Sequence, residues 1–198
     1  MPTAPETYFL PPTPHVPNSR LPALVYRSVL TAPLSATSTI ASVEPNHWLK
    51  GGVFKAVRTH HFHSVTHECY AVFRGESSLL LGRGPGDDVE MERGERSGEG
   101  AEGWMTRRVV VSLREGDVIV LPAGLSHCSL DPADGYEYVG FYPEGSLKWD
   151  NNWCKADVTE TAEKAKVAKS VAIPEFDPIY GREGPLVEIW RKADDLAG

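Results

Sequence analysis

The sequence has few of the features that mark secreted, membrane-spanning or nucleic-acid-binding proteins. Its three cysteines, Cys69, Cys128 and Cys154, are odd in number and too few for a disulfide framework, which favours a reducing, cytoplasmic location. No hydrophobic run approaches the roughly 18 residues that a membrane-spanning helix needs, and the first residues lack the basic and apolar regions of a secretory signal. With 27 acidic against 20 basic residues and a formal net charge of −7, neither nucleic acid nor an anionic membrane is expected as a partner.

What is present suits one globular domain with a sizeable core. The 198 residues are 41% hydrophobic and 24% charged, which is ordinary for such a domain. Short β-branched and aromatic runs are separated by turns about every ten residues, a pattern typical of an all-β sandwich or barrel. The expected strands are Leu24–Leu30, Val53–His63, Glu68–Phe73, Ser77–Leu81, Arg107–Leu113, Val118–Leu121 and Glu137–Tyr142.

Two pairs of these strands are expected to form hairpins. Glu68–Phe73 is followed by Ser77–Leu81 after the turn Arg74-Gly75-Glu76. Arg107–Leu113 and Val118–Leu121 are joined by a short segment that contains Gly116 and Asp117, a common hairpin signal.

The ends of the chain and one internal segment differ from the β-rich part. Residues 1–22 are rich in proline, which fixes φ and removes a backbone donor, so they are expected to form an extended arm anchored by Tyr8, Phe9 and Leu10, or else a disordered tail. Residues 83–104 are rich in glycine and charge, and are interpreted as a flexible insert, either a lid or disordered. The expected domains are therefore the arm 1–22, the barrel 23–150 and a C-terminal part 151–198.

The C-terminal part is predicted to contain one helix and a docking tail. The helix begins at Asp157, because Asp157-Val158-Thr159-Glu160 has the form of a capping box. Pro174 lies beyond its end. The apolar cluster Leu186–Trp190 is expected to dock on the barrel.

Two stretches that lie far apart in the sequence contain residues of the types that bind metals. His61 and His63 are two residues apart, so on an extended segment both side chains point to the same face. Glu68 follows five residues after His63. The third histidine, His127, follows the Pro122-Ala123-Gly124 turn. Three imidazoles and a carboxylate that converge from strands form a ligand set for a divalent transition metal.

Spacing alone leaves the fourth ligand open between His67 and Glu68, because the two are adjacent and adjacent strand residues face opposite ways. Glu68 is favoured, and its choice places Tyr70 and Val72 on the inner face as candidate substrate-binding residues. His67 is then a structural residue. If His67 is the ligand instead, Glu68 becomes a free general base beside the metal.

The joint spacing H-x-H-x4-E-x6-G, followed about forty residues later by G-x5-P-x-G-x2-H, resembles the two motifs of the cupin superfamily over about residues 55–142. Within that superfamily the chain looks most like the YjlB-like group of small single-domain proteins. This closer likeness rests on His63-Ser64-Val65-Thr66-His67-Glu68, on Gly140-Phe141-Tyr142-Pro143-Glu144-Gly145, and on Asp177-Pro178-Ile179-Tyr180-Gly181 with Gly184-Pro185-Leu186. The motif departs at Lys55, where a glycine is expected, and at Asp131, where an asparagine is expected; neither is a ligand position.

The resemblance implies an all-β, single-domain antiparallel β-barrel, the cupin double-stranded β-helix or jelly roll, with a metal at its centre and frequent homodimers. The ligand set does not name the metal, which is Fe, Mn, Ni or Zn. The leading hypothesis is a metal-dependent enzyme acting on a small organic molecule, with a dioxygenase first and an isomerase or decarboxylase next. The other hypothesis is a non-catalytic small-molecule or sugar-binding protein with a structural metal. Catalytic residues are not assigned, and both hypotheses rest on fold-level analogy.

Overall fold

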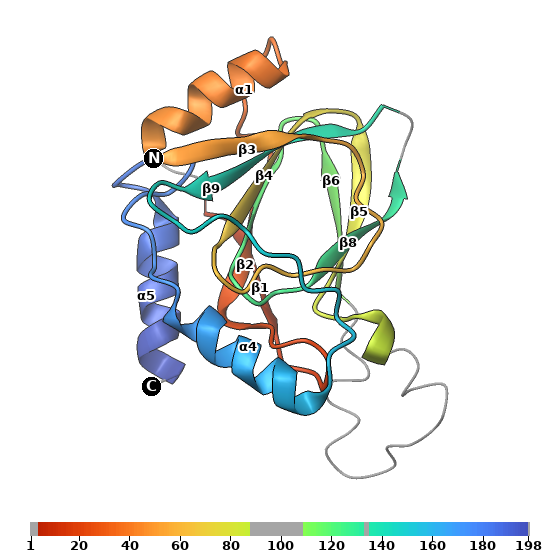
Figure 1. The fold of residues 1–198 in the computed structure, drawn as a ribbon. Coiled ribbons are helices and arrows are strands. Elements are labelled where there is room, and N and C mark those ends of the chain that lie inside the picture. Colours follow the sequence, from red (N-terminus) through yellow and green to blue (C-terminus); the bar gives the residue numbers. More distant parts are fainter. Residues whose placement is uncertain (1–3, 88–108, 133–134, 198) are drawn as a thin grey trace.

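Two antiparallel sheets face each other in the protein, as a computed structural model that describes residues 4–87, 109–132 and 135–197 shows (Figure 1). The larger sheet has the order β1 (Glu6–Leu10), β2 (Ser19–Tyr26), β7 (Val118–Leu121), β4 (Glu68–Arg74), β9 (Glu137–Pro143) and β3 (Trp48–Phe54). The smaller sheet has the order β6 (Val109–Arg114), β5 (Glu76–Leu81) and β8 (His127–Pro132). The all-β jelly-roll prediction is confirmed, although the two sheets do not close into one barrel.

Neither of the two expected hairpins forms, because both tight turns lead from one sheet to the other. β4 pairs with β7 and β9 in the larger sheet, whereas β5 pairs with β6 and β8 in the smaller one. Gly75, between β4 and β5, has a φ of +67°, and a Cβ there would lie 3.0 Å from the backbone of Tyr136. A left-handed glycine thus lets the chain change sheets where a larger residue would collide. A turn signal fixes a change of direction but not the partner of the strand that follows.

β4 shows how strand alternation divides the core into two layers. Glu68, Tyr70 and Val72 point between the sheets, while Cys69, Ala71 and Phe73 pack in the outer layer. Because successive residues of a strand face opposite sides, the inward set is the one that the sequence predicts. Every residue of β4 except Arg74 is buried, as expected of a strand covered on both faces.

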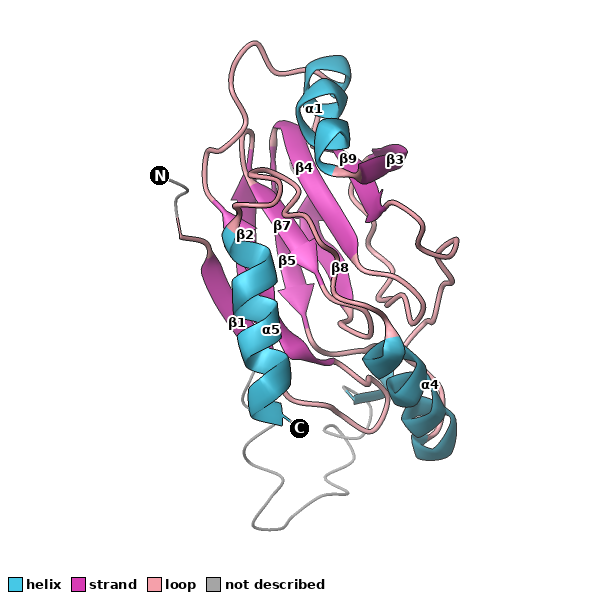
Figure 2. Ribbon diagram, turned by 90° about the vertical axis from the view of Figure 1, so that its left-hand side faces the viewer, coloured by secondary structure: helices cyan, strands magenta, loops and turns pink. Residues whose placement is uncertain are grey.

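The outer face of the larger sheet is covered by helices. α5 (Pro185–Ala197) lies along this face over β2 (Figure 2), with Leu186 and Trp190 completely buried. The indole N–H of Trp190 donates to the carbonyl oxygen of Pro22 over 2.9 Å. The predicted docking of the tail is thus achieved by a helix that the sequence analysis did not predict, since Pro178, Gly181 and Gly184 just before it resemble a loop. Pro185 is the first residue of the helix, a position where proline is favoured.

Further helices flank the sheets. α4 (Val158–Ser170) begins at the predicted place, and the Asp157 carboxylate accepts the backbone N–H of Glu160 over 2.9 Å. α1 (Ala36–Val43) and the short 3₁₀ helix η1 (Glu44–Asn46) precede β3. None of the helices among the described residues is both long and apolar enough to span a membrane.

The bounds of β2 and β3 differ from the expected ones, and β8 was not predicted as a strand. β3 ends at Phe54, so His61 and His63 lie beyond it in a segment held by isolated bridges rather than in one long strand. β2 begins at Ser19, within the predicted arm, and β1 makes the arm an edge strand. Most of the predicted insert 83–104 lies outside the described residues.

Candidate metal centre

The structure brings His61, His63, Glu68 and His127 together between the two sheets. One ligand atom from each of the four lies within 4.8 Å of the others. All four side chains are buried, with exposed fractions of 2–5%. The backbone of His61 pairs with that of His127 through two hydrogen bonds of 3.2 and 2.9 Å, which holds the two rings 4.4 Å apart.

The turn that contains Gly124 holds the segment of His61 and His63 in place. The N–H of Gly124 donates to the carbonyl oxygen of His63 over 2.8 Å. Gly124 has a φ of +88°, and a Cβ there would lie 2.6 Å from the carbonyl oxygen of Asn18. The Pro-x-Gly turn before His127 therefore requires glycine at this position.

Backbone carbonyl groups determine which nitrogen each histidine presents. Nδ1 of His61 contacts the carbonyl oxygen of Thr59 at 2.9 Å, and Nδ1 of His127 contacts that of Leu125 at 3.2 Å. Nδ1 of His63 contacts the carbonyl oxygen of Asp150. A carbonyl oxygen can only accept, so Nδ1 must donate in each ring, and a neutral ring then has an unprotonated Nε2. This is the tautomer and the outer contact that metal-binding histidines commonly have.

Glu68 completes the cluster with an oxygen that lacks a hydrogen bond. Its Oε2 lies 3.1 Å from Nε2 of His63 and 3.3 Å from Nε2 of His127, yet it receives no donor. Lone pairs that face one another at this distance in a buried site repel unless a cation lies among them. Ligand atoms about 2.1 Å from a common ion lie roughly 3 Å apart at right angles, so these two distances fit a shared divalent metal.

The charges in the cluster shift the pKa values in opposite directions. Burial lowers the pKa of His61 to about 3, and the neighbouring His127 contributes to this. Burial also acts to lower the pKa of His63, but the negative charge of Glu68 outweighs it and raises that pKa. Burial acts to raise the pKa of Glu68, but His63 and His127 outweigh it and lower that pKa. Glu68 is therefore ionised beside His63 and His127, and its negative charge favours a cation in the cluster.

Two tyrosine hydroxyl groups contact the cluster. Tyr70 donates to Nε2 of His127 over 2.8 Å, and Tyr142 donates to Oε1 of Glu68 over 2.5 Å. Burial and the nearby Glu68 raise the pKa of both phenols, so both remain protonated donors at neutral pH. Val72, the second predicted substrate-binding residue, is completely buried in the apolar layer between the sheets.

His67 lies on the opposite side of β4 from the cluster. Its Nδ1 accepts the backbone N–H of Ala123 over 2.9 Å, and its Nε2 donates to the carbonyl oxygen of Ala172 over 3.2 Å. Its ring packs 4.6 Å from that of Trp190, and burial lowers its pKa to about 4. Both ring nitrogens are occupied, so His67 joins the strand to the C-terminal part and is not one of the four converging residues.

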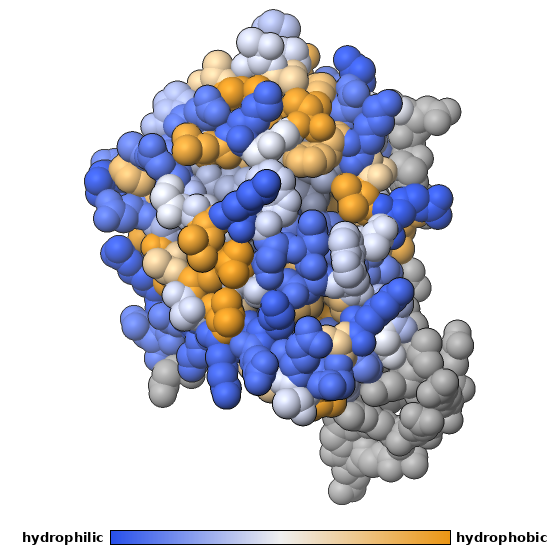
Figure 3. All heavy atoms as spheres, in the orientation of Figure 1, coloured by the Kyte–Doolittle hydropathy of each residue, from blue (hydrophilic) through white to orange (hydrophobic). Residues whose placement is uncertain are grey.

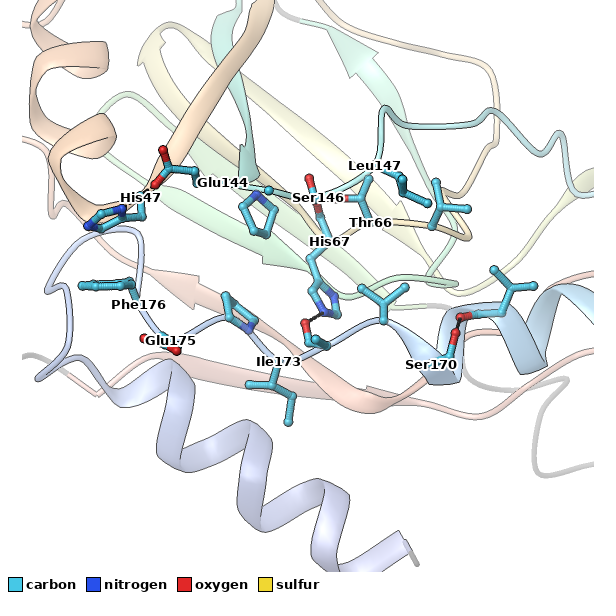
Figure 4. Close-up of a pocket in the computed structure, with 17 residues that line it drawn as sticks. His47, Thr66, His67, Glu144, Ser146, Leu147, Ser170, Ile173, Glu175 and Phe176 are labelled. Carbon is cyan, nitrogen blue, oxygen red and sulfur yellow. Dashed lines mark hydrogen bonds and ion pairs between the residues drawn. The ribbon is translucent and has the colours of Figure 1, made fainter.

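The pocket nearest His67 is separate from the cluster. A surface groove of about 590 Å³ runs between the loop after β9 and the segment that connects α4 to α5, and residues such as Thr66, His67, Leu147, Ile173 and Phe176 line it (Figure 4). None of the four cluster residues lines this groove. The segment after β9 crosses the front of the molecule toward α4 in Figure 1, and the carbonyl oxygen of its Asp150 contacts Nδ1 of His63.

Three residues near the cluster were not found by the sequence analysis, namely Tyr142, Asp150 and Trp153. Trp153 is 51% exposed, and its ring lies 6.2 Å from that of His61. Leu147 on the same segment is 69% exposed, and hydrophobic side chains on this face lie in several groups between hydrophilic ones (Figure 3). Tyr142 lies in the predicted strand Glu137–Tyr142, but strand alternation alone does not show which face of that strand points toward the cluster. No local signal in the sequence indicates that residues 150 and 153 approach the cluster.

A jelly roll with this buried cluster defines a class of β protein that could hold a divalent metal between its sheets. Over 188 residues the chain is 30% identical to the "Uncharacterized protein YjlB" of Bacillus subtilis (strain 168), with 94% of this chain and 97% of that protein covered. The chain therefore belongs to the same family as YjlB. A scan against protein-family models found no match.

Proposed function

We propose that this protein is a cupin that binds a divalent transition metal through Nε2 of His61, His63 and His127 and a carboxylate oxygen of Glu68. The single observation that carries the proposal is the convergence of three imidazole groups and one carboxylate oxygen that lacks a donor. A buried group without a partner is costly, and a metal would give Oε2 of Glu68 the partner that it lacks. The jelly-roll arrangement and the motif spacing support the cupin assignment.

We further propose that the metal serves an enzyme acting on a small organic acid, phenol or keto compound, with dioxygenation first and isomerisation or decarboxylation next. Four protein ligands leave positions open on a five- or six-coordinate ion, and the ion would supply Lewis acidity or redox chemistry there. When Nε2 of His127 binds the metal, the Tyr70 hydroxyl loses its present acceptor. It is then free to donate to an oxygen atom of a bound substrate, which supports Tyr70 as a substrate-binding residue. Val72 would form part of the apolar wall.

The second candidate is a small-molecule or sugar-binding protein with a structural metal. The observation that favours it is the nearly complete burial of all four cluster residues, since structural sites are closed whereas catalytic sites keep a position open to water.

Two measurements on one preparation separate these candidates. Elemental analysis of protein purified without added metal identifies the ion and its occupancy. Oxygen consumption against a panel of enols and phenols then tests for dioxygenation, and water-proton relaxation of the Mn(II)-loaded protein tests for an exchangeable water. Rapid water exchange together with substrate-dependent oxygen uptake supports the enzyme; a bound ion without either supports the structural role.

A further inference from the structure

The segment that follows β9 contains none of the four cluster residues, yet its residues 150–153 contact the stretch that carries His61 and His63. Asn152 and Phe62 exchange two backbone hydrogen bonds of 3.0 and 3.1 Å, so the histidine-bearing stretch is bordered by this segment on one side and by β8 on the other. Asp150, two residues before Asn152, makes the direct contact: its carbonyl oxygen accepts the Nδ1–H of His63.

The carboxylate of Asp150 holds this carbonyl group in place. It accepts the backbone N–H of Ser64 over 2.7 Å and the hydroxyl of Ser64 over 2.6 Å. The Asn152 amide donates to it over 2.7 Å. Ser64 is the residue directly after His63 and is itself 1% exposed. Asp150 therefore binds His63 and its neighbour at the same time, through its backbone and its side chain.

The nearby lysine does not explain this arrangement. Lys164 lies 3.9 Å from Asp150, and both side chains are about one-third exposed. An ion pair so long and so solvated contributes little. The short contacts of the Asp150 carboxylate are all directed toward the histidine segment and Asn152.

We propose that Asp150 is a positioning residue of the metal centre, which fixes the ring orientation and the tautomer of His63 by clamping Ser64. The inference rests on the proposed function, since it assigns His63 as a ligand. When Nδ1 of His63 keeps its proton and donates it to the carbonyl oxygen of Asp150, Nε2 is unprotonated and is a better ligand. Outer contacts of this kind typically change metal affinity by about 10–100-fold. Without the carboxylate, the carbonyl of residue 150 is no longer held opposite His63, so the ring is free to rotate.

The test compares Co(II) affinity, the visible absorption of the Co(II)-loaded protein, and the protonated ring nitrogen of His63 by ¹H–¹⁵N NMR of the metal-free protein. Asp150→Ala is expected to weaken Co(II) binding by about tenfold or more, to shift the absorption at full loading, and to mix the two tautomers of His63. Asp150→Asn keeps one acceptor and should lie between Ala and the wild type, which provides a second variant if Ala folds poorly.

Asp157→Ala is the matched control. Asp157 caps α4 through Glu160, which is not one of the cluster residues, so its loss should lower thermal stability without changing the Co(II) affinity or spectrum. A purely structural role for Asp150 would give the same result as this control and would overturn the proposal.

A double-mutant cycle with Ser64→Ala tests whether Asp150 acts through Ser64. If it does, the effects of the two substitutions are not additive, because the residues are coupled. The Co(II) affinity of the double variant is then within about twofold of the lower of the two single-variant affinities. Fully additive losses would overturn the clamp. A wild-type protein that binds no Co(II) would overturn the proposed function, whereas normal binding that is unaffected by Asp150→Ala would overturn only this inference.

Discussion

The hydroxyl of Tyr142 donates a 2.5 Å hydrogen bond to Oε1 of Glu68, which joins the end of β9 to the start of β4 across the cluster. Tyr142 also stacks on Trp149, with ring centroids 4.6 Å apart. Oε1 of Glu68 is therefore occupied by the tyrosine, and Oε2 is the oxygen that faces the histidines. Because Oε1 is bound by Tyr142, a metal in the cluster would be coordinated by Oε2.

Tyr142→Phe should destabilise the metal-free protein by about 1–3 kcal/mol, because Oε1 of Glu68 would remain buried without its donor. Phenylalanine keeps the ring that stacks on Trp149. The free energy of unfolding is measured in urea on chelator-treated protein. Tyr8→Phe is the matched control, since its hydroxyl donates to the exposed Glu6, and a loss as large as that at Tyr142 would contradict the argument from burial.

Replacing His61 and His63 together by alanine should abolish metal binding. Two of the four ligands are lost, and the remaining pair cannot hold the ion against water. Elemental analysis of the purified variant is the measurement, with circular dichroism to show that it is folded. Full occupancy in the double variant would rule out this assignment of the site.

Glu68→Gln should weaken metal binding tenfold to hundredfold, about 1.4–2.8 kcal/mol, because the variant keeps the size of the side chain but loses its charge. His67→Gln should cost much less, since both of its ring nitrogens contact backbone groups on the other side of β4. Chelator competition at fixed pH compares the two variants. A larger loss at His67 would instead indicate an all-histidine site with Glu68 as a free base.

Metal affinity should fall as the pH drops below about 6.5, because imidazole ligands must be deprotonated. His63, whose pKa is raised, should be protonated at a higher pH than His61, whose pKa is lowered. The stability of the metal-free protein depends on pH in the opposite direction to metal affinity. The raised pKa of His63 stabilises the folded state below the pKa that His63 has in the unfolded chain, and this stabilisation is lost as the pH rises through the pKa of the folded state.

Thermal unfolding with and without metal at pH values between about 6 and 8 measures both effects. The stabilisation by metal should increase with pH, and equal stabilisation at both ends of the range would contradict the involvement of His63.

A homodimer is expected, with β1 at its interface. β1 is an edge strand of the larger sheet, and its Phe9 is 56% exposed; exposed edge strands readily pair with another chain. Light scattering should give twice the 21.7 kDa of one chain. Phe9→Ser should weaken the dimer, while Leu196→Ser, which changes a more exposed residue on α5, should not. A mass of about 22 kDa for the wild type at micromolar concentration would refute the prediction.

Features that depend on local geometry could be predicted from the sequence. Strand alternation places Glu68, Tyr70 and Val72 on one face and His67 on the other, because side chains along a strand point alternately to the two sides. The cap at Asp157 is equally local, since a carboxylate reaches a backbone N–H three residues away.

The pairing partners of the strands could not be predicted from the sequence, because a turn does not specify the sheet that the next strand joins. They are known only from the tertiary structure. The same holds for His63 and Asp150, which are 87 residues apart, and for His67 and Ala172, which are 105 residues apart. These contacts depend on how the segment after β9 and the C-terminal part fold back over β4. Hydrogen bonds between residues so distant in sequence form only when the whole fold closes, so no periodicity or spacing in the chain encodes them.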